Sequence, residues 1–386
     1  MNYRRFGSLA WQVSALGFGC MRLPLINGDS ARIDELEAMR MVRYAIDRGV
    51  NYIDTAYPYH GGNSELFVGR ALQDGYRDKV RLATKLPVWK VQSKDDLDLV
   101  FDEQLRKLQT DHIDFYLLHG LNRERWDKLR RLGVLTWAER AIADRRIRHL
   151  GFSFHDALPV FKEIVDGYAW TFCQIQYNYM DIDHQAGIAG LRYAATKGMA
   201  VVIMEPLLGG KLVEPPAPIQ AIWDTADVKR SPADWALQWL WNQPEVSVVL
   251  SGMNTQGQVV QNVASASTAR VNALVARELA LFDQVRAKYN DLSPIPCTKC
   301  EYCLPCPNGV AIPRVFAAYN DGMMFNKPDV ARRGYKQWIP VENQASACVQ
   351  CLECETKCPQ NIPISQWLPV VHQVLGEDKP YVKRLN

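Results

Sequence analysis

The stretch VNYIDTAYPYHGGNSE, residues 50–65, decides the predicted fold. A short apolar run with β-branched and aromatic side chains ends in Asp54, and a glycine-rich loop that carries Tyr59 follows it. Two later apolar runs also end in a polar side chain, the first in Lys85 and the second in His119. Polar side chains at the ends of several apolar strands are typical of an α/β protein whose active site lies at the carboxyl ends of parallel strands.

Strand and helix patterns alternate along most of the chain. The predicted strands are 13–19, 50–54, 82–85, 115–119, 149–153, 172–176, 200–205 and 246–251, and the predicted helices between them are 33–48, 64–73, 93–108, 126–143, 157–165, 185–197 and 232–242. Eight strands that alternate with helices over about 250 residues predict a (β/α)8 TIM barrel. A doubly wound open sheet is the structural alternative, but that fold usually carries G-x-G-x-x-G where its first helix opens, and the sequence has no such run.

Asp54, Tyr59, Lys85 and His119 resemble the catalytic tetrad of the aldo-keto reductases, and they occur in the order that this family shows. The opening of the chain, residues 3–21, is similar to the start of the same family. The resemblance implies that Tyr59 is the general acid and base of carbonyl reduction, and that His119 orients the carbonyl oxygen. It also implies that Lys85 lowers the pKa of the Tyr59 phenol while Asp54 keeps Lys85 charged, since an ammonium stabilises a nearby phenolate.

The same resemblance implies a nicotinamide cofactor at the strand ends. The predicted cofactor-binding residues are Gly19, Cys20, Met21, Asp54, Ser153, Gln174, Met204, Glu205, Pro206, Leu207, Ser251, Gly252, Met253, Gln258 and Asn262. Ser153 and Gln174 match the pair that holds the nicotinamide carboxamide in the family, although Phe154 stands where the family commonly has Asn. Met204 occupies the position at which many members stack a Tyr on the nicotinamide ring, and a thioether can also pack there.

Residues 251–262 resemble the loop that binds the adenosine phosphate in aldo-keto reductases, but they contain no Lys or Arg. Arginine is the usual partner of the 2′-phosphate that distinguishes NADP(H) from NAD(H). The sequence therefore favours NAD(H) as the cofactor, with NADP(H) as the alternative.

Eight of the ten cysteines lie beyond residue 296, and only Cys20 and Cys173 stand elsewhere. The first run is C-x2-C-x2-C-x2-C-P and the second is C-x2-C-x2-C-x3-C-P, and each is soon followed by Ile-Pro. In two-cluster ferredoxins, three cysteines at this spacing bind one [4Fe–4S] cluster, and the fourth, before a proline, binds the other cluster. The predicted ligands are Cys297, Cys300, Cys303 and Cys358 for one cluster and Cys348, Cys351, Cys354 and Cys306 for the other.

Two features of these runs leave alternatives open. The first run is one residue shorter than usual before Cys306, so the role of that cysteine as a ligand is an open point. Zinc is the rival metal, but zinc prefers isolated cysteine pairs in a tetrahedral site, and a third cysteine in each run is surplus for it. The pattern favours two [4Fe–4S] clusters over zinc.

The chain is predicted to have two domains, a barrel over residues 1–290 and a mainly helical ferredoxin-like domain over residues 291–386. Residues 267–288 are predicted to be helical, and the proline-containing stretch 292–296 is predicted to be a stiff hinge. The net charge of +3 arises from 45 basic and 42 acidic residues, so no strong field favours nucleic acid as a partner. No apolar run approaches the ~20 residues that cross a bilayer, and iron–sulfur ligation favours a reducing cytoplasm.

Two classes of function fit these patterns. The first is an oxidoreductase, a carbonyl reductase or alcohol dehydrogenase that transfers a hydride between NAD(P)H and an aldehyde or ketone. Its clusters would be structural, sensory, or a relay of electrons to a redox protein partner. The second is a redox-sensing or interaction protein that binds nicotinamide without efficient turnover. The complete tetrad favours the enzyme. Trp89, Trp126 and Trp223 lie in predicted loops, where they would form an aromatic wall of the substrate pocket or pack the second domain.

Overall fold

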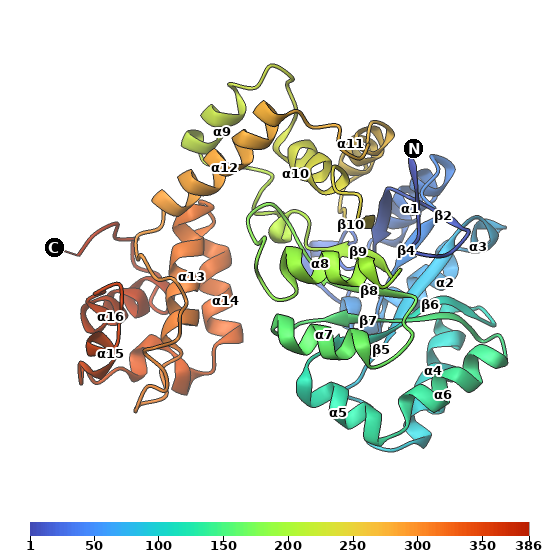
Figure 1. Cartoon of the computed structure of the whole chain (residues 1–386), viewed down its shortest axis with the longest axis horizontal. Helices are drawn as coiled ribbons and strands as arrows, with labels where there is room; N and C mark the ends of the chain where they lie inside the picture. Colours follow the sequence, from blue (N-terminus) through green and yellow to red (C-terminus); the bar gives the residue numbers. More distant parts are fainter. Residues whose placement is uncertain (386) are drawn as a thin grey trace. The chain divides into compact units, whose positions relative to one another are not determined.

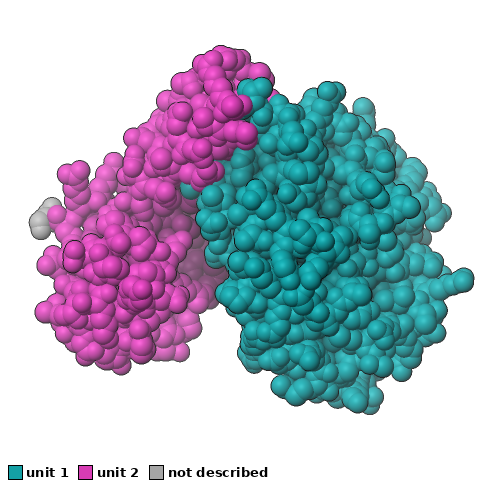
Figure 2. All heavy atoms as spheres, in the orientation of Figure 1, with its two compact units in different colours: residues 1–209, 233–275 teal, residues 210–232, 276–386 magenta. Residues whose placement is uncertain are grey.

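The computed structural model describes residues 1–385, which form two compact units (Figure 2). The first unit contains residues 1–209 and 233–275, and the second contains residues 210–232 together with those from 276 onward. The segment 210–232 thus interrupts the first unit in sequence but belongs with the C-terminal residues by its packing. The compact units divide the chain differently from the domain boundary expected at residue 290, and that boundary stays a prediction.

Eight parallel strands close into a barrel in the order β10-β3-β4-β5-β6-β7-β8-β9 (Figure 1). They are β3 (Leu16–Gly19), β4 (Tyr52–Asp54), β5 (Arg81–Leu86), β6 (Ile113–Leu121), β7 (Ile147–Phe154), β8 (Phe172–Gln176), β9 (Ala200–Met204) and β10 (Val246–Gly252). The closed order confirms the predicted TIM barrel and excludes the open doubly wound sheet. Its interior is apolar and buried, as the packed centre of such a barrel requires.

A short hairpin closes the N-terminal end of the barrel. Strands β1 (Tyr3–Arg5) and β2 (Gln12–Ser14) pair antiparallel, and Phe6 between them enters the barrel interior. The Phe6 ring lies 4.5 Å from the ring centroid of Phe115 and 5.7 Å from that of Phe172. The single first strand predicted over residues 13–19 is therefore two strands. Val13 and Ser14 pair with Arg4 and Tyr3 in the hairpin, and only the residues from Leu16 pair with a strand of the barrel.

Helices lie outside the strands of the first unit (Figure 1). They are α1 (Glu35–Asp47), α2 (Ser64–Ala71), α3 (Tyr76–Lys79), α4 (Asp95–Leu108), α5 (Arg123–Arg131), α6 (Val134–Ala143), α7 (Leu158–Asp166), α8 (Gly187–Thr196), α10 (Pro232–Trp241) and α11 (Gln256–Ser267). In α1, the buried side chains recur at three- and four-residue intervals, and the Asp34 side chain accepts a hydrogen bond from the Glu37 main-chain N–H. Periodic burial and an N-terminal cap explain why this stretch forms a helix.

Two of the predicted helices have different limits in the structure. The helix predicted over residues 126–143 is split into α5 and α6, because Gly133 between them has a φ of 75° that a right-handed helix does not allow. The helix predicted over residues 267–288 is wrong in its first part, since α11 ends at Ser267. The chain beyond α11 is held out of a helix by Asn242, whose main-chain oxygen accepts from the Asn272 N–H at 2.9 Å.

The second unit is mainly helical, as predicted for the C-terminal domain. Its helices are α9 (Ala217–Trp223), α12 (Ala276–Asp291), α13 (Ile312–Met324), α14 (Pro328–Trp338), α15 (Glu353–Thr356) and α16 (Ile364–Leu375). Tyr319 of α13 and Trp367 of α16 are buried, and their ring centroids lie 5.7 Å apart in an apolar core of this unit's own. Within residues 1–385, every helix is too short or too polar to span a lipid bilayer.

Candidate active site and cluster sites

The four predicted catalytic residues come together at the carboxyl ends of neighbouring strands. Asp54 is the last residue of β4, Lys85 lies near the end of β5, and His119 lies near the end of β6. Tyr59 lies in the loop after β4, at the start of a short 3-10 helix, Tyr59–Gly62. Because β4, β5 and β6 are parallel neighbours, these side chains meet at one mouth of the barrel.

Lys85 is the centre of this arrangement. Its Nζ donates hydrogen bonds to both carboxylate oxygens of Asp54, at 2.8 and 2.9 Å, and to the main-chain oxygen of Thr55 at 2.8 Å. The same Nζ donates to the Tyr59 hydroxyl oxygen at 3.4 Å. Lys85 and Asp54 are only 1% and 2% exposed, so this ion pair is held in a fixed place away from water.

Burial has opposite consequences for the ammonium and the phenol. Burial alone would lower the pKa of Lys85, but the charge and hydrogen bonds of Asp54 raise that pKa above its ordinary value, so Lys85 stays charged. Burial raises the pKa of the Tyr59 phenol, and this effect outweighs the lowering by Lys85. The prediction that Lys85 lowers the phenol pKa is right for the contribution of the lysine and wrong for the net shift. Tyr59 is protonated and able to donate.

His119 lies beside Tyr59 as a neutral imidazole. The two ring centroids are 6.4 Å apart with the planes at 85°, and the Trp89 ring lies 5.3 Å from His119 on another side. Burial, reinforced by the charge of Lys85, holds the pKa of His119 well below its usual range. Its buried Nδ1 has no hydrogen-bond partner among residues 1–385, so the ring keeps hydrogen-bonding capacity for a bound molecule.

Gln174 and Ser153 present free hydrogen-bonding capacity where the nicotinamide carboxamide is expected. The Gln174 Oε1 atom is buried without a partner in the described chain, while its Nε2 contacts the Met204 sulfur at 3.7 Å. Ser153 Oγ accepts a hydrogen bond from the Gly120 N–H at 2.7 Å and keeps its own proton to donate. An unpartnered buried oxygen beside a hydroxyl fits a carboxamide, which needs one acceptor and one donor.

The other predicted cofactor residues are distributed over three strand ends and helix α11. Gly19, Cys20 and Met21 stand at the end of β3, Met204, Glu205, Pro206 and Leu207 at the end of β9, and Ser251, Gly252 and Met253 at the end of β10. Asn262 Nδ2 donates to Ser251 Oγ at 3.0 Å, which joins α11 to the end of β10. The Gln258 side-chain oxygen accepts from the Asn254 N–H at 2.9 Å, so it helps to shape the loop before α11.

Arg22 is a cation at this site that the sequence patterns did not single out. A Cβ built on Gly252 would lie 3.2 Å from the Cβ of Arg22, and a Cβ built on Gly209 would lie 3.4 Å from its Nη2. The arginine side chain therefore runs from the end of β10 toward the loop after β9. Its position directly after the predicted cofactor residues Gly19 to Met21 is the signal that could have found it.

Of the three tryptophans considered for an aromatic wall, Trp89 alone lies beside the tetrad. It is 42% exposed and packs against His119. Trp126 is 1% exposed and packs on Trp170, and Trp223 is 2% exposed and packs on Phe282. The expectation of a wall is wrong for Trp126 and Trp223, because both serve the interior of their own unit.

The eight C-terminal cysteines surround two separate cavities in the second unit. One cavity is lined by Cys297, Cys300, Cys303 and Cys358, and the other by Cys306, Cys348, Cys351 and Cys354. These groups equal the two predicted ligand sets, including the exchange of Cys306 and Cys358 between the runs. Ile312, the first residue of α13, lines both cavities.

The two cysteine loops have the same backbone conformation. Lys299 and Glu301 in the first loop have φ of 58° and 63°, and Gln350 and Leu352 at the equivalent positions of the second have φ of 57° and 68°. Left-handed residues between right-handed or extended ones turn main-chain N–H groups toward one concave side, which suits anionic iron–sulfur clusters. The Gln350 N–H accordingly lies 3.4 Å from Cys348 Sγ. The loops fit two [4Fe–4S] clusters.

Among residues 1–385, no three or more His, Cys, Asp or Glu side chains converge on a point where a single metal ion would bind. The four cysteines of each cavity stand instead around a space. That is the arrangement that a cube of four irons and four sulfides requires of its ligands.

Comparison with known families agrees with both sites. The sequence model of the aldo/keto reductase family matches residues 15–286. The chain belongs to the aldo/keto reductase family. A second model, of a 4Fe-4S dicluster domain, matches residues 296–362, which contain all eight clustered cysteines. The protein is therefore an oxidoreductase of this family, with a C-terminal iron–sulfur domain.

Curated relatives and solved structures resemble the barrel part of this aldo/keto reductase. L-galactose dehydrogenase from Arabidopsis thaliana is 28% identical over 69% of this chain and 88% of its own. Probable aldo-keto reductase 1 from Glycine max is 23% identical over 67% of this chain and 82% of its own. An aldo-keto reductase from Bacillus halodurans in its holo form has a TM-score of 0.62 at 27% identity, over 74% of this chain and 96% of its own. One from Klebsiella pneumoniae in complex with NADP and acetate has a TM-score of 0.59 at 26% identity, over 74% and 95%.

Proposed function

We propose that the protein is a nicotinamide-dependent carbonyl reductase or alcohol dehydrogenase that acts on an aldehyde or ketone. The observation that supports this most is the buried Lys85, which is bonded to Asp54 and donates to the Tyr59 hydroxyl at 3.4 Å. A charged lysine, a protonated phenol and a neutral imidazole at one barrel mouth are the groups that carbonyl reduction needs.

Each residue has a separate role in the proposed reaction. When bound, the nicotinamide supplies a hydride to the carbonyl carbon. Tyr59 donates its proton to the carbonyl oxygen as that oxygen gains negative charge, and Lys85 stabilises the phenolate that remains. His119 donates a hydrogen bond that orients the carbonyl oxygen. In the reverse direction, the Tyr59 phenolate accepts the proton of the alcohol.

The clusters are proposed to lie outside the path of the hydride. A hydride carries two electrons together, whereas each [4Fe–4S] cluster passes one, and coupling the two normally needs a carrier such as a flavin. The sequence contains no recognisable flavin motif, and Tyr59 with Lys85 suffices for direct reduction. The clusters are then structural, sensory, or a relay to a redox protein partner.

NAD(H) is the proposed cofactor, because the loop 251–262 offers no cation to a 2′-phosphate. Arg22 does not alter this preference. Its stem lies beside Gly252 and its guanidinium reaches Gly209, in the loop after β9, while the adenosine end is expected at residues 251–262. That position suits the pyrophosphate, which NAD(H) and NADP(H) share.

The Arg22→Ala variant is expected to bind NADH and NADPH both about tenfold more weakly, with the ratio of their affinities unchanged. The physical reason is the loss of one cation beside a phosphate group common to the two cofactors. Fluorescence titration at two salt concentrations measures both affinities, and Arg32→Ala, an exposed arginine of the same loop region, is the matched control. Tighter binding of NADPH that disappears selectively in Arg22→Ala would reverse the proposed preference.

Redox sensing is the second candidate function, and one observation favours it. The segment 210–232 follows directly on the predicted cofactor residues after β9, yet it packs within the iron–sulfur unit. Lys211 Nζ donates to Asp321 Oδ2 of α13 at 2.5 Å, and Lys327 pairs with Glu214. Helix α13 begins at Ile312, which lines both cluster cavities, and it contains Asp321. The Lys211–Asp321 ion pair therefore connects the segment after Leu207 to a helix that borders both cavities.

If the protein is a redox sensor, reduction of the clusters is expected to change the affinity for NADH by about fivefold, a factor that is ordinary for coupling between two binding sites. Lys211→Met should remove the change, because it breaks the ion pair that joins the loop to α13. Anaerobic titration of oxidised and dithionite-reduced protein measures it, with Lys229→Met as a control in the same segment. Equal affinities in the two redox states would leave the clusters without this role.

A further inference from the structure

A cavity of about 280 Å³ opens at the end of the barrel opposite the tetrad. Its lining includes Arg81, the first residue of β5, and Arg148 and His149, which follow the first residue of β7. Lys85 and Ser153 stand toward the other ends of the same two strands. The cavity is thus separated from the catalytic mouth by the packed interior of the barrel.

The cavity has an excess of positive charge. Asp114, its acidic lining residue, is 2% exposed and already bonded: to Arg77 at 2.8 Å, to the Leu82 N–H at 2.9 Å and to Arg81 at 3.3 Å. Arg148 is exposed and has no ion pair or hydrogen bond in the described part of the chain. The Asp114 carboxylate is therefore neutralised by Arg77 and Arg81, and the Arg148 guanidinium can pair with an anionic ligand.

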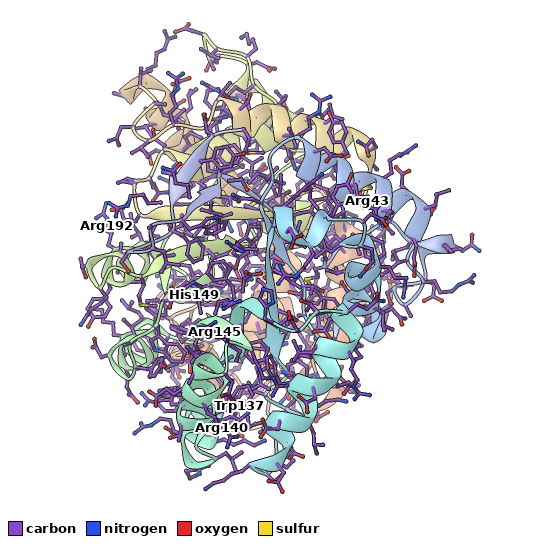
Figure 3. All side chains as sticks on the ribbon, turned by 90° about the vertical axis from the view of Figure 1, so that its right-hand side faces the viewer. Arg43, Trp137, Arg140, Arg145, His149 and Arg192 are labelled. Carbon is purple, nitrogen blue, oxygen red and sulfur yellow. The ribbon has the colours of Figure 1, made fainter. Side chains whose placement is uncertain are left out.

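The inner wall of the cavity is flat and aromatic. The rings of Phe115 and His149 stack at 5.2 Å with 25° between their planes, and Trp11 lies 5.5 Å from Phe115. Figure 3 shows His149 inside the circle formed by the helices. Burial, opposed by Asp114, lowers the pKa of His149, so the ring is a neutral part of this wall near pH 7.

We propose that this cavity binds a small molecule that carries a carboxylate or phosphate on a flat ring, with Arg148 and Arg81 holding the anion. The ring would lie against Trp11, Phe115 and His149. A guanidinium with no acidic partner at the opening and a stacked aromatic wall behind it match the two halves of such a ligand. Water or a simple ion would contact only the guanidinium groups and would leave the aromatic wall unused.

Calorimetry on the full chain with its clusters, in saturating NADH, tests the proposal with four probes. We expect 1-naphthyl phosphate or 1-naphthoate to bind at least about tenfold more tightly than inorganic phosphate or 1-naphthol, because only the first two engage both the cations and the wall. The phosphate and carboxylate arms identify which anion is preferred. Saturating NADH excludes the phosphate-binding surface at the catalytic mouth as the source of the signal.

Arg148→Gln should weaken binding of the better naphthyl probe about tenfold, and Arg145→Gln, an exposed cation nearby that does not line the cavity, should not. Neither variant should alter carbonyl reduction. The Arg148 side chain is exposed and has no ion pair or hydrogen bond among residues 1–385, so a melting temperature like that of the wild type establishes that the variant is folded. Absence of saturable binding by both naphthyl probes, displacement of the probe by NADH, or equal affinity in Arg148→Gln would overturn the proposal.

Discussion

Replacement of Tyr59 by phenylalanine is expected to lower kcat for aldehyde reduction by about a hundredfold to ten-thousandfold. The variant keeps the ring beside His119 and loses only the hydroxyl that accepts from Lys85. Because this hydroxyl gives its proton in the transition state and does not contact the cofactor, the Kd for NADH should change by no more than about twofold. Anaerobic loss of NADH absorbance measures kcat, and fluorescence titration measures Kd.

Tyr57→Phe is the matched control for this prediction. Tyr57 lies in the same loop, but its hydroxyl contacts Glu103 at 3.0 Å and Lys90 at 2.6 Å and not the tetrad. Loss of that hydroxyl should leave kcat near the wild-type value. Equal activity of Tyr59→Phe and wild type would remove Tyr59 from its proposed role.

Anaerobically purified protein is expected to contain about eight irons and eight sulfides per chain, and Cys351→Ser about four of each. Cys351 lines the second cavity with Cys306, Cys348 and Cys354, so its loss should remove one cluster and leave the other. The folded variant should keep much of its NADH-driven carbonyl reduction, because the hydride path does not include a cluster. Iron and sulfide analysis and the NADH assay measure the two outcomes.

Cys173→Ala is the control for the cluster prediction, since Cys173 is buried in β8 of the first unit and far in sequence from either run. Its iron content should stay at about eight per chain. Stoichiometric zinc without sulfide in the wild type would establish the rival metal. Complete loss of turnover in folded Cys351→Ser would put the clusters on the electron path.

The barrel and the tetrad could be predicted because their signals are local and repeated. Asp54, Lys85 and His119 each end a short apolar run, and the rule that parallel strands of a barrel end at one mouth brings them together without further information. The cysteine runs were equally informative, because a fixed ligand spacing leaves few ways to surround a cluster. The exchange of Cys306 and Cys358 between the cavities follows from that rule.

The remaining features depend on contacts between residues distant in sequence. Arg22 lies near Gly209 and Gly252 only because β3, β9 and β10 adjoin in the closed barrel. Burial raises the pKa of Tyr59 by more than Lys85 lowers it, and the extent of that burial cannot be predicted from the sequence of a loop. The sequence pattern places Trp126 where a loop meets a predicted helix, whereas α5 begins at Arg123, so Trp126 lies inside that helix and packs on Trp170.

Transfer of deuterium tests the central claim, direct hydride reduction at the Tyr59 site, most directly. NADH deuterated at C4 of the nicotinamide on the transferred face is used to reduce an aldehyde anaerobically, and the alcohol is examined by mass spectrometry. We predict one deuterium on the former carbonyl carbon of each product molecule, because the hydride passes without exchange with water. Alcohol that carries no deuterium, formed at the same rate, would contradict direct transfer and would require electrons to reach the carbonyl by another route.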